Sequence, residues 1–390
     1  MPHKSTYFTR TSYNIIQTRD AWEQSLKILS IEPKIAIDIE ANSLYEYPGE
    51  ICLIQISTRG YDFLLDPLTN FPFPELGELL SNPKIEKIFH ASEYDLRLLW
   101  HQYHWTVNHL FDTMWAGKLL GYKQLGLVSF LQSLLNVQHN KKFQKSNWKK
   151  RPLSLQQLNY ASRDSHYLIP LEKNLKKQLI EKGLWEEAQE IFEELPKETV
   201  KKEKNSTQLS KMIRNNSLSP KNIHILCELY QYREKLGKSL HIPPNHLISN
   251  KCLINIAKTI PTTIDELNEM PRAQSIAKNV NKQELLHIIS KPLPTNNDIT
   301  IPPKNDNYQQ IKKRTCYLMQ WRKEQAIIRN VDSDIVLPKS KLAFLAIHGP
   351  KTYQELIKLK ILGPVRLKMY GEQITEVLKK ADEFFEQNHS

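Results

Sequence analysis

A proline-rich window interrupts the second half of the chain and limits what that half can fold into. The window runs from residue 291 to 307 and contains Pro292, Pro294, Pro302 and Pro303. Because proline lacks the backbone donor and clashes with the preceding helical turn, this window predicts a connector and not a helix. A charged stretch at residues 196–207 predicts a solvated linker or an exposed helix end. Together the two interruptions predict three domains, at residues 1–196, 208–290 and 308–390.

The second and third parts resemble each other in sequence. Each begins with an amphipathic helical pattern that carries aromatic and Arg residues, at 229–233 and at 319–322. Each continues through a turn that contains proline. After this turn, each has a Thr three residues before a Glu-Leu pair; this Thr is Thr263 in one part and Thr352 in the other. A repeat of this kind predicts two small all-α domains of the same fold.

The first part has a different pattern, with apolar strand-like runs that precede helical periodicity. Strands are expected at residues 34–40, 49–57, 61–66 and 85–90, the second and third as a hairpin. Helices are expected at residues 93–101, 113–120, 126–135, 155–181 and 184–195. This order predicts an α/β domain.

The charge of the chain indicates a polyanionic partner. Lys and Arg number 54 against 42 Asp and Glu, which gives a net charge of +12. Basic surface attracts phosphates and releases their counterions on binding. The four cysteines form no CxxC-type pair, so neither a zinc site nor a disulfide framework is expected. This cysteine usage predicts a location in the reducing cytoplasm. Neither a secretory signal nor a membrane span is expected.

Four carboxylates and one tyrosine are the candidate catalytic residues. Asp38 and Glu40 are two apart on a strand and therefore share a face. Asp95 follows a strand on the first turn of a helix, and Tyr160 and Asp164 are four apart on one helical face. Each feature alone also fits a structural account: a solvated strand face, a favourable charge at a helix N-terminus, or a half-buried tyrosine.

Taken together, these residues favour phosphodiester hydrolysis. Divalent cations bind hard oxygen ligands, and carboxylates from separate elements supply them. Two such ions can activate a water and stabilise the leaving oxygen, while a tyrosine hydroxyl positions the water. The chemistry is the same for RNA and DNA.

The ordered motifs resemble the DEDD exonuclease superfamily. They are Asp38-Ile-Glu40, the segment from His90 to Asp95, and Tyr160-Ala-Ser-Arg-Asp164. The Tyr-x-x-x-Asp spacing selects the tyrosine branch, because Asn159 stands where the histidine branch has its histidine. The segment 148–160 further resembles the ribonuclease D family, and both helical parts look like the helicase-and-ribonuclease-D C-terminal (HRDC) domain.

This resemblance implies a ribonuclease-H-like α/β exonuclease domain followed by two small all-α domains. It implies that Asp38, Glu40, Asp95 and Asp164 bind two Mg²⁺ or Mn²⁺ ions, and that Tyr160 positions the water. The implied activity is 3′→5′ exoribonuclease trimming of tRNA precursors and small structured RNAs, with release of nucleoside 5′-monophosphates. Membrane association and an obligate protein partner are not expected. The first helical part departs from the pattern, because Met270-Pro-Arg-Ala lacks the Gly turn found at Leu362-Gly363.

A basic loop just before Tyr160 is the candidate RNA-binding segment. It offers cations for phosphates and aromatic rings for base stacking. Its candidate residues are Lys141, Lys142, Phe143, Lys145, Trp148, Lys149, Lys150 and Arg151. A solvated charge run remains the alternative, and Trp148 can instead be buried as an anchor of the loop.

Other candidates and other functions stay open. His90 is expected to be a hydrogen-bonded or core histidine and not a metal ligand, and Gln55 can face the substrate or simply belong to a strand. Arg233 and Arg322 are further candidates for contacting RNA. The alternative functions are a 3′→5′ DNA exonuclease and an RNA-binding scaffold without catalytic activity.

Overall fold

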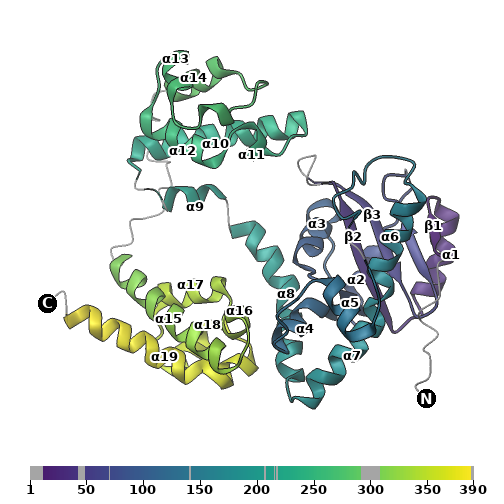
Figure 1. The fold of residues 1–390 in the computed structure, drawn as a ribbon. Helices are drawn as coiled ribbons and strands as arrows, with labels where there is room; N and C mark the ends of the chain where they lie inside the picture. The colour runs from purple at the N-terminus through teal and green to yellow at the C-terminus, as the bar shows by residue number, and fades with distance from the viewer. Residues whose placement is uncertain are drawn as a thin grey trace.

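The computed structural model describes residues 12–42, 49–69, 71–139, 142–205, 208–214, 216, 218–290 and 308–387. Within these residues a sheet-containing N-terminal domain is followed by two helical modules (Figure 1). The α/β fold class and the all-α character of both repeats are confirmed. The proline window 291–307 lies outside the described residues.

The N-terminal domain is built on a six-stranded mixed sheet in the order β1-β4-β3-β2-β5-β6. β2 and β3 are antiparallel, as are β3 and β4, while the remaining neighbours are parallel. The hairpin expected from the sequence is therefore present as β3 and β4. The strands are β1 (Asn14–Ile16), β2 (Lys34–Ala41), β3 (Ile51–Ser57), β4 (Asp62–Leu65), β5 (Glu86–Phe89) and β6 (Leu110–Asp112).

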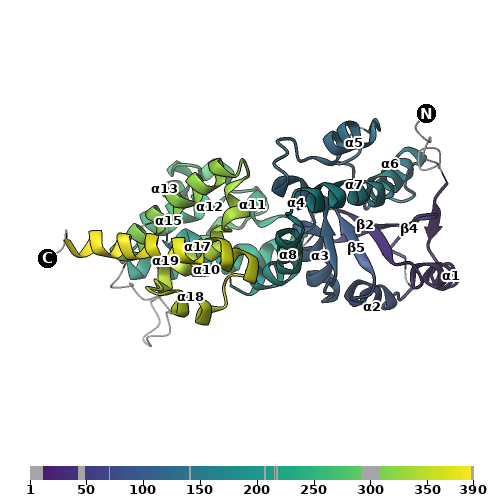
Figure 2. The same ribbon diagram turned by 90° about the horizontal axis from the view of Figure 1, so that it is seen from below.

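Helices cover both faces of this sheet (Figure 2). α6 packs on β2, β3 and β4, and α7 packs on β2 and β5, whereas α1 and α2 lie on the other side. The helices of this domain are α1 (Arg19–Leu29), α2 (Glu75–Ser81), α3 (Glu93–Tyr103), α4 (Thr113–Leu119), α5 (Leu127–Leu135), α6 (Leu155–His166), α7 (Leu168–Glu181) and α8 (Trp185–Asn205). The prediction of a single helix at 155–181 is wrong, because the helix is interrupted at Tyr167, which lies between α6 and α7.

The helical modules repeat the same element order. The first contains α10 (Pro220–Leu240), α11 (Pro244–Leu247), α12 (Asn250–Thr259), α13 (Ile264–Glu269) and α14 (Lys282–Ser290), preceded by α9 (Gln208–Arg214). The second contains α15 (Tyr308–Ile328), α16 (Ser333–Val336), α17 (Lys339–His348), α18 (Tyr353–Leu359) and α19 (Pro364–Gln387). The repeated Thr is an N-cap in both modules: Thr263 and Thr352 accept from the backbone N–H three residues later. Each module has its own apolar core.

The Arg residues on the first helix of each module are structural. Arg233 is fully buried and donates to the Ile248 carbonyl and to Asn250. Arg322 is also buried and donates to the Ser333 carbonyl. The expectation that these two side chains contact RNA is therefore wrong: in each module they fasten the long helix to the segment after it.

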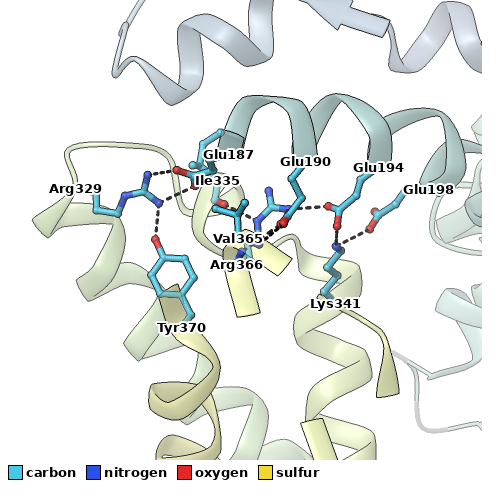
Figure 3. A network of polar contacts seen from close by, with 10 residues as sticks. All are labelled: Glu187, Glu190, Glu194, Glu198, Arg329, Ile335, Lys341, Val365, Arg366 and Tyr370. Atoms are coloured by element: carbon cyan, nitrogen blue, oxygen red, sulfur yellow. Dashed lines mark hydrogen bonds and ion pairs between the residues drawn. The ribbon is translucent and has the colours of Figure 1, made fainter. Parts of the chain in front are cut away.

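The charged stretch at 196–207 is in part an extension of α8, which runs on to Asn205. One face of α8 carries four glutamates spaced three or four apart, here called the acidic stripe: Glu187, Glu190, Glu194 and Glu198. In Figure 3 these side chains point toward basic side chains of the second module. Their partners are Arg329, Lys341 and Arg366.

Apolar burial reinforces this interface. Ile335 of α16 is fully buried and belongs to the core of the N-terminal domain. The second module is therefore docked on α8 by both ion pairs and packing, and the stretch before residue 199 is not a solvated linker. Within the described residues, no helix is both long and apolar enough to cross a membrane.

Candidate active site

Three of the predicted carboxylates converge where α6 crosses the sheet. Asp38 and Glu40 lie on β2, and Asp164 lies on α6, which packs on that strand. α6 begins with a capping box between Ser154 and Gln157, which fixes where the helix starts and hence which face it turns to the sheet. Carboxylate oxygens of Asp38, Glu40 and Asp164 all lie within 4.8 Å of one another.

This donor set suits a hard divalent cation. It consists only of carboxylate oxygens, which come from two elements far apart in the sequence, as Mg²⁺ and Mn²⁺ sites require. Charge repulsion from neighbouring carboxylates contributes to the raised pKa of both Asp38 and Glu40. The cluster therefore fits a metal site, and the ion would relieve its mutual repulsion.

Asp95 lies next to this cluster and is not one of the three grouped carboxylates. It is buried on the first turn of α3, directly after β5. Burial, followed by the charges of Asp38 and Asp112, raises its pKa well above the ordinary value. A charge effect of this kind shows that Asp95 faces the same acidic region.

Asp112 stabilises the turn before the helix that carries Asp95, and sequence analysis did not identify Asp112 as a site residue. Its carboxylate accepts from the backbone N–H groups of Ala91 and Ser92, at 3.2 and 2.7 Å. It also caps α4 by accepting from Met114 and Trp115. Ala91 has a left-handed backbone with φ 60°, which is unfavourable for a residue with a Cβ. Asp112 therefore stabilises a strained turn at the site.

The other carboxyls are also shifted toward their neutral forms. Burial is the largest cause for each, and charge repulsion within the cluster adds to it for Asp38 and Glu40. The pKa of Asp38 rises to about 8, and that of Glu40 rises well above its ordinary value. Burial also raises the pKa of Asp164, although a hydrogen bond from His139 partly offsets this. Bound cations would reverse these shifts.

Tyr160 stands one helical turn before Asp164 and is surrounded by rings. The rings of His139, Phe143 and Trp148 have centroids 5.3, 6.0 and 6.2 Å from that of Tyr160. Burial, followed by the nearby charge of Asp164, raises the pKa of the phenol. The hydroxyl therefore stays protonated at neutral pH, so it can orient a water but does not serve as a phenolate.

A cleft of about 400 Å³ opens beside these groups. Asp38, Glu40, Asp164 and Tyr160 line one part of it. Apolar side chains line another part, namely Ile39, Met114, Leu125, Leu127 and Val128. The cleft therefore combines an acidic floor with an apolar wall.

His90 and Gln55, the two further candidates from the sequence, both lie near the acidic cluster. His90 lines the cleft, and its Nδ1 lies 2.9 Å from the Thr113 hydroxyl, as expected for a hydrogen-bonded histidine. Gln55 is paired with Asp38 in the β2–β3 register and is fully buried. Its amide has no hydrogen-bonding partner among the described residues.

The basic loop is less exposed than its composition indicated. Trp148 is 1% exposed and packs in a core cluster, so it anchors the loop and cannot stack on a base in this structure. Arg151 donates to both carboxylate oxygens of Asp66, each at 2.7 Å. Lys149 pairs with Glu50 at 3.1 Å. The burial of Trp148 favours the alternative that it anchors the loop, whereas RNA contact by Arg151, whose side chain is 26% exposed, stays a prediction.

Exposed lysines occupy other positions of the loop. The Lys142, Lys145 and Lys150 side chains are exposed, and the Lys142 ammonium lies 5.7 Å from the Phe143 ring centroid. Lys141 lies outside the described residues. RNA binding by the exposed lysines and by Phe143 stays a prediction.

Comparison with protein families divides the chain in the same way. Residues 13–180 match a family described as 3′-5′ exonuclease, and residues 224–289 and 313–378 each match the HRDC domain. The chain is 30% identical to ribonuclease D of Bartonella henselae over 289 residues, which are 73% of this chain and 69% of that protein. It is 26% identical to ribonuclease D of Haemophilus influenzae over 351 residues, which cover 89% and 85% of the two chains.

Other relatives are much longer than this chain. The exosome complex component 10 homolog of Caenorhabditis elegans is 29% identical over 271 residues, which are 67% of this chain but 30% of that protein. The chain spans about a third of the length of such exosome relatives. Among solved structures, Escherichia coli RNase D has the same fold, with a TM-score of 0.72 over 95% of this chain and 99% of that one at 18% identity.

Proposed function

This chain belongs to the ribonuclease D family, and on that premise we propose that it shortens RNA from the 3′ end by metal-dependent hydrolysis. The observation that carries the proposal is the convergence of Asp38, Glu40 and Asp164 within 4.8 Å, with Tyr160 one helical turn from Asp164. The proposed substrates are the 3′ trailers of tRNA precursors and other small structured RNAs. The proposed products are nucleoside 5′-monophosphates.

We assign the metal to the acidic floor of the cleft. Asp38, Glu40 and Asp164 would hold Mg²⁺ or Mn²⁺, with Asp95 completing a site for two ions. When bound, the ions supply Lewis-acid stabilisation of the phosphate and activation of water. The bound ions would keep the carboxylates ionised, whereas the packing of α6 across β2 brings them together at one place.

Tyr160 would orient the attacking water. Its protonated hydroxyl can both donate and accept a hydrogen bond, and the rings around it restrict how the side chain turns. The apolar wall formed by Leu125, Leu127 and Val128 offers a surface for the terminal nucleoside. A single-stranded 3′ end is favoured, because a paired end must be unpaired before it enters the cleft.

The helical modules and the exposed lysines would bind the body of the RNA. The net charge of +12 supports such a role, and the second module is docked by ion pairs on α8 of the domain that contains the cleft. We also propose a cytoplasmic location, which the four unpaired cysteines support.

The test uses a 3′-extended tRNA and a single-stranded DNA, each labelled at the 5′ end. Each is incubated with Mg²⁺, with Mn²⁺ or with EDTA, using the full chain and its Asp38→Ala variant. The matched control is Asp20→Ala, because Asp20 is an exposed acid on α1 and lies outside the cleft.

We expect a ladder of RNA shortened from its 3′ end with either metal, absent with EDTA and absent in Asp38→Ala. Asp20→Ala should behave as the unmodified chain. Shortening of DNA alone would reassign the chain as a DNA exonuclease. Binding of RNA without shortening would favour the scaffold.

A further inference from the structure

His139 contacts two residues of the proposed site, although it belongs to none of the three motifs. It lies in the segment between α5 and α6, just beyond Asn136, whose left-handed backbone ends α5. Val137 anchors this segment by burial. The His139 side chain is only 4% exposed and lines the cleft.

The imidazole makes two specific contacts. Its Nε2 lies 2.6 Å from Asp164 Oδ1, so the Nε2–H tautomer donates to that carboxylate oxygen. Its ring stacks on Tyr160 with centroids 5.3 Å apart and planes 21° apart. Because the side chain is shielded from solvent, water competes little for the hydrogen bond.

We propose that His139 is a positioning residue that orients the Asp164 carboxylate toward the metal and holds the Tyr160 ring beside it. One Asp164 oxygen is bound by the imidazole N–H, which fixes the plane of the carboxylate and leaves the other oxygen for the metal. Hydrogen bonds of this kind to a ligating carboxylate typically change metal affinity about 10- to 100-fold. The stacked ring limits rotation of the phenol. The inference rests on the proposed function.

Two substitutions separate these two contacts. His139→Phe keeps a flat ring against Tyr160 but removes the N–H that donates to Asp164. His139→Gln keeps an amide N–H at a similar reach but removes the ring. His139→Ala removes the same donor with a smaller side chain, and it carries the test if His139→Phe does not fold.

The chain offers a matched control on the same helix as Asp164. His166 also pairs with a carboxylate, with Nδ1 2.9 Å from Asp62 Oδ2, and it also contacts a tyrosine ring, that of Tyr167. Asp62 does not belong to the acidic cluster. His166→Phe therefore removes an equivalent His–Asp pair without touching the proposed metal ligands.

The measurement is Mn²⁺ binding to the full chain without RNA, by isothermal titration calorimetry, with circular dichroism as a check on folding. We expect His139→Phe to bind Mn²⁺ about 10-fold more weakly, whereas His139→Gln and His166→Phe bind as the unmodified chain does. With RNA, His139→Gln should lower kcat more than it raises KM, because Tyr160 has lost its stacked ring.

The outcomes distinguish this inference from the proposed function. Mn²⁺ affinity in His139→Phe equal to that of the unmodified chain, with Asp38→Ala unable to bind, would overturn the role of His139 and leave the site intact. An equal loss of Mn²⁺ affinity in His166→Phe would also overturn the role of His139, since removing any His–Asp pair of this helix would then weaken Mn²⁺ binding. Failure of the unmodified chain to bind Mn²⁺ would overturn both.

Discussion

Removing Glu190 from the acidic stripe should loosen the second module from α8. Glu190 is 7% exposed and accepts from the Val365 backbone N–H at 2.6 Å. It also pairs with the Arg366 guanidinium at 3.4 Å. In Figure 3 it points from α8 toward the start of α19. The substitution Glu190→Ala removes both contacts at once.

The magnitude follows from the burial of Arg366, which is 1% exposed. Leaving one member of a buried ion pair unmatched costs about 3–5 kcal/mol. Arg366 retains Glu194 at 2.7 Å and the Ile335 carbonyl at 3.2 Å, so the loss should lie at the lower end, about 3 kcal/mol. At about 1.4 kcal/mol per factor of ten, this loss corresponds to a roughly 100-fold larger population of the undocked state.

Hydrogen exchange measured by mass spectrometry reports this opening directly. Backbone amides near the start of α19 should exchange about 100-fold faster in Glu190→Ala, if opening limits exchange there. Glu193→Ala is the matched control, because Glu193 is an exposed glutamate of the same helix that does not belong to the acidic stripe. Equal exchange in the two variants would refute the view that the acidic stripe docks the module.

Three further predictions concern the cleft and its loop. Tyr160→Phe should lower turnover far more than RNA affinity, as single-turnover kinetics and filter binding would show; equal losses would contradict water positioning. With EDTA present, the free energy of unfolding in urea should fall as pH rises from 3.8 to about 8, because folded Asp38 holds a proton that the unfolded chain has released. Added Mn²⁺ should reverse that fall. Arg151→Lys should cost about 2 kcal/mol of stability through loss of its paired bonds to Asp66, with RNA affinity unchanged.

The sequence predicts the central strands well and the edge strands poorly. β3 is an almost continuous apolar run, and β2 alternates apolar and polar residues toward its end, so their residue patterns predict strands. β4 and β5 are shorter, but each ends in apolar residues that the sheet buries. β1 and β6 have three residues each, which is too short for a periodicity to emerge. Their strand conformation comes from pairing with β4 and β5, which only the folded chain supplies.

Sequence periodicity likewise predicts some residues of the candidate site and not others. Asp38 with Glu40, and Tyr160 with Asp164, are pairs whose shared face follows from strand and helix periodicity. His139 has no such relation to Asp164, and it reaches that residue only because the segment after α5 folds back over α6. The pairing of Arg151 could not be predicted for the same reason, since its partner Asp66 lies 85 residues earlier.

The acidic stripe shows what a charge run can mean beyond solvation. Its four glutamates repeat at three- and four-residue spacing, so they form one face of α8, and cations opposite them relieve their mutual repulsion. Those cations come from α15–α19. Because α8 also packs on α3, the helix that carries Asp95, the docked second module and the acidic cleft share one scaffold. If the second module binds RNA as proposed, it does so while docked on the domain that contains the cleft.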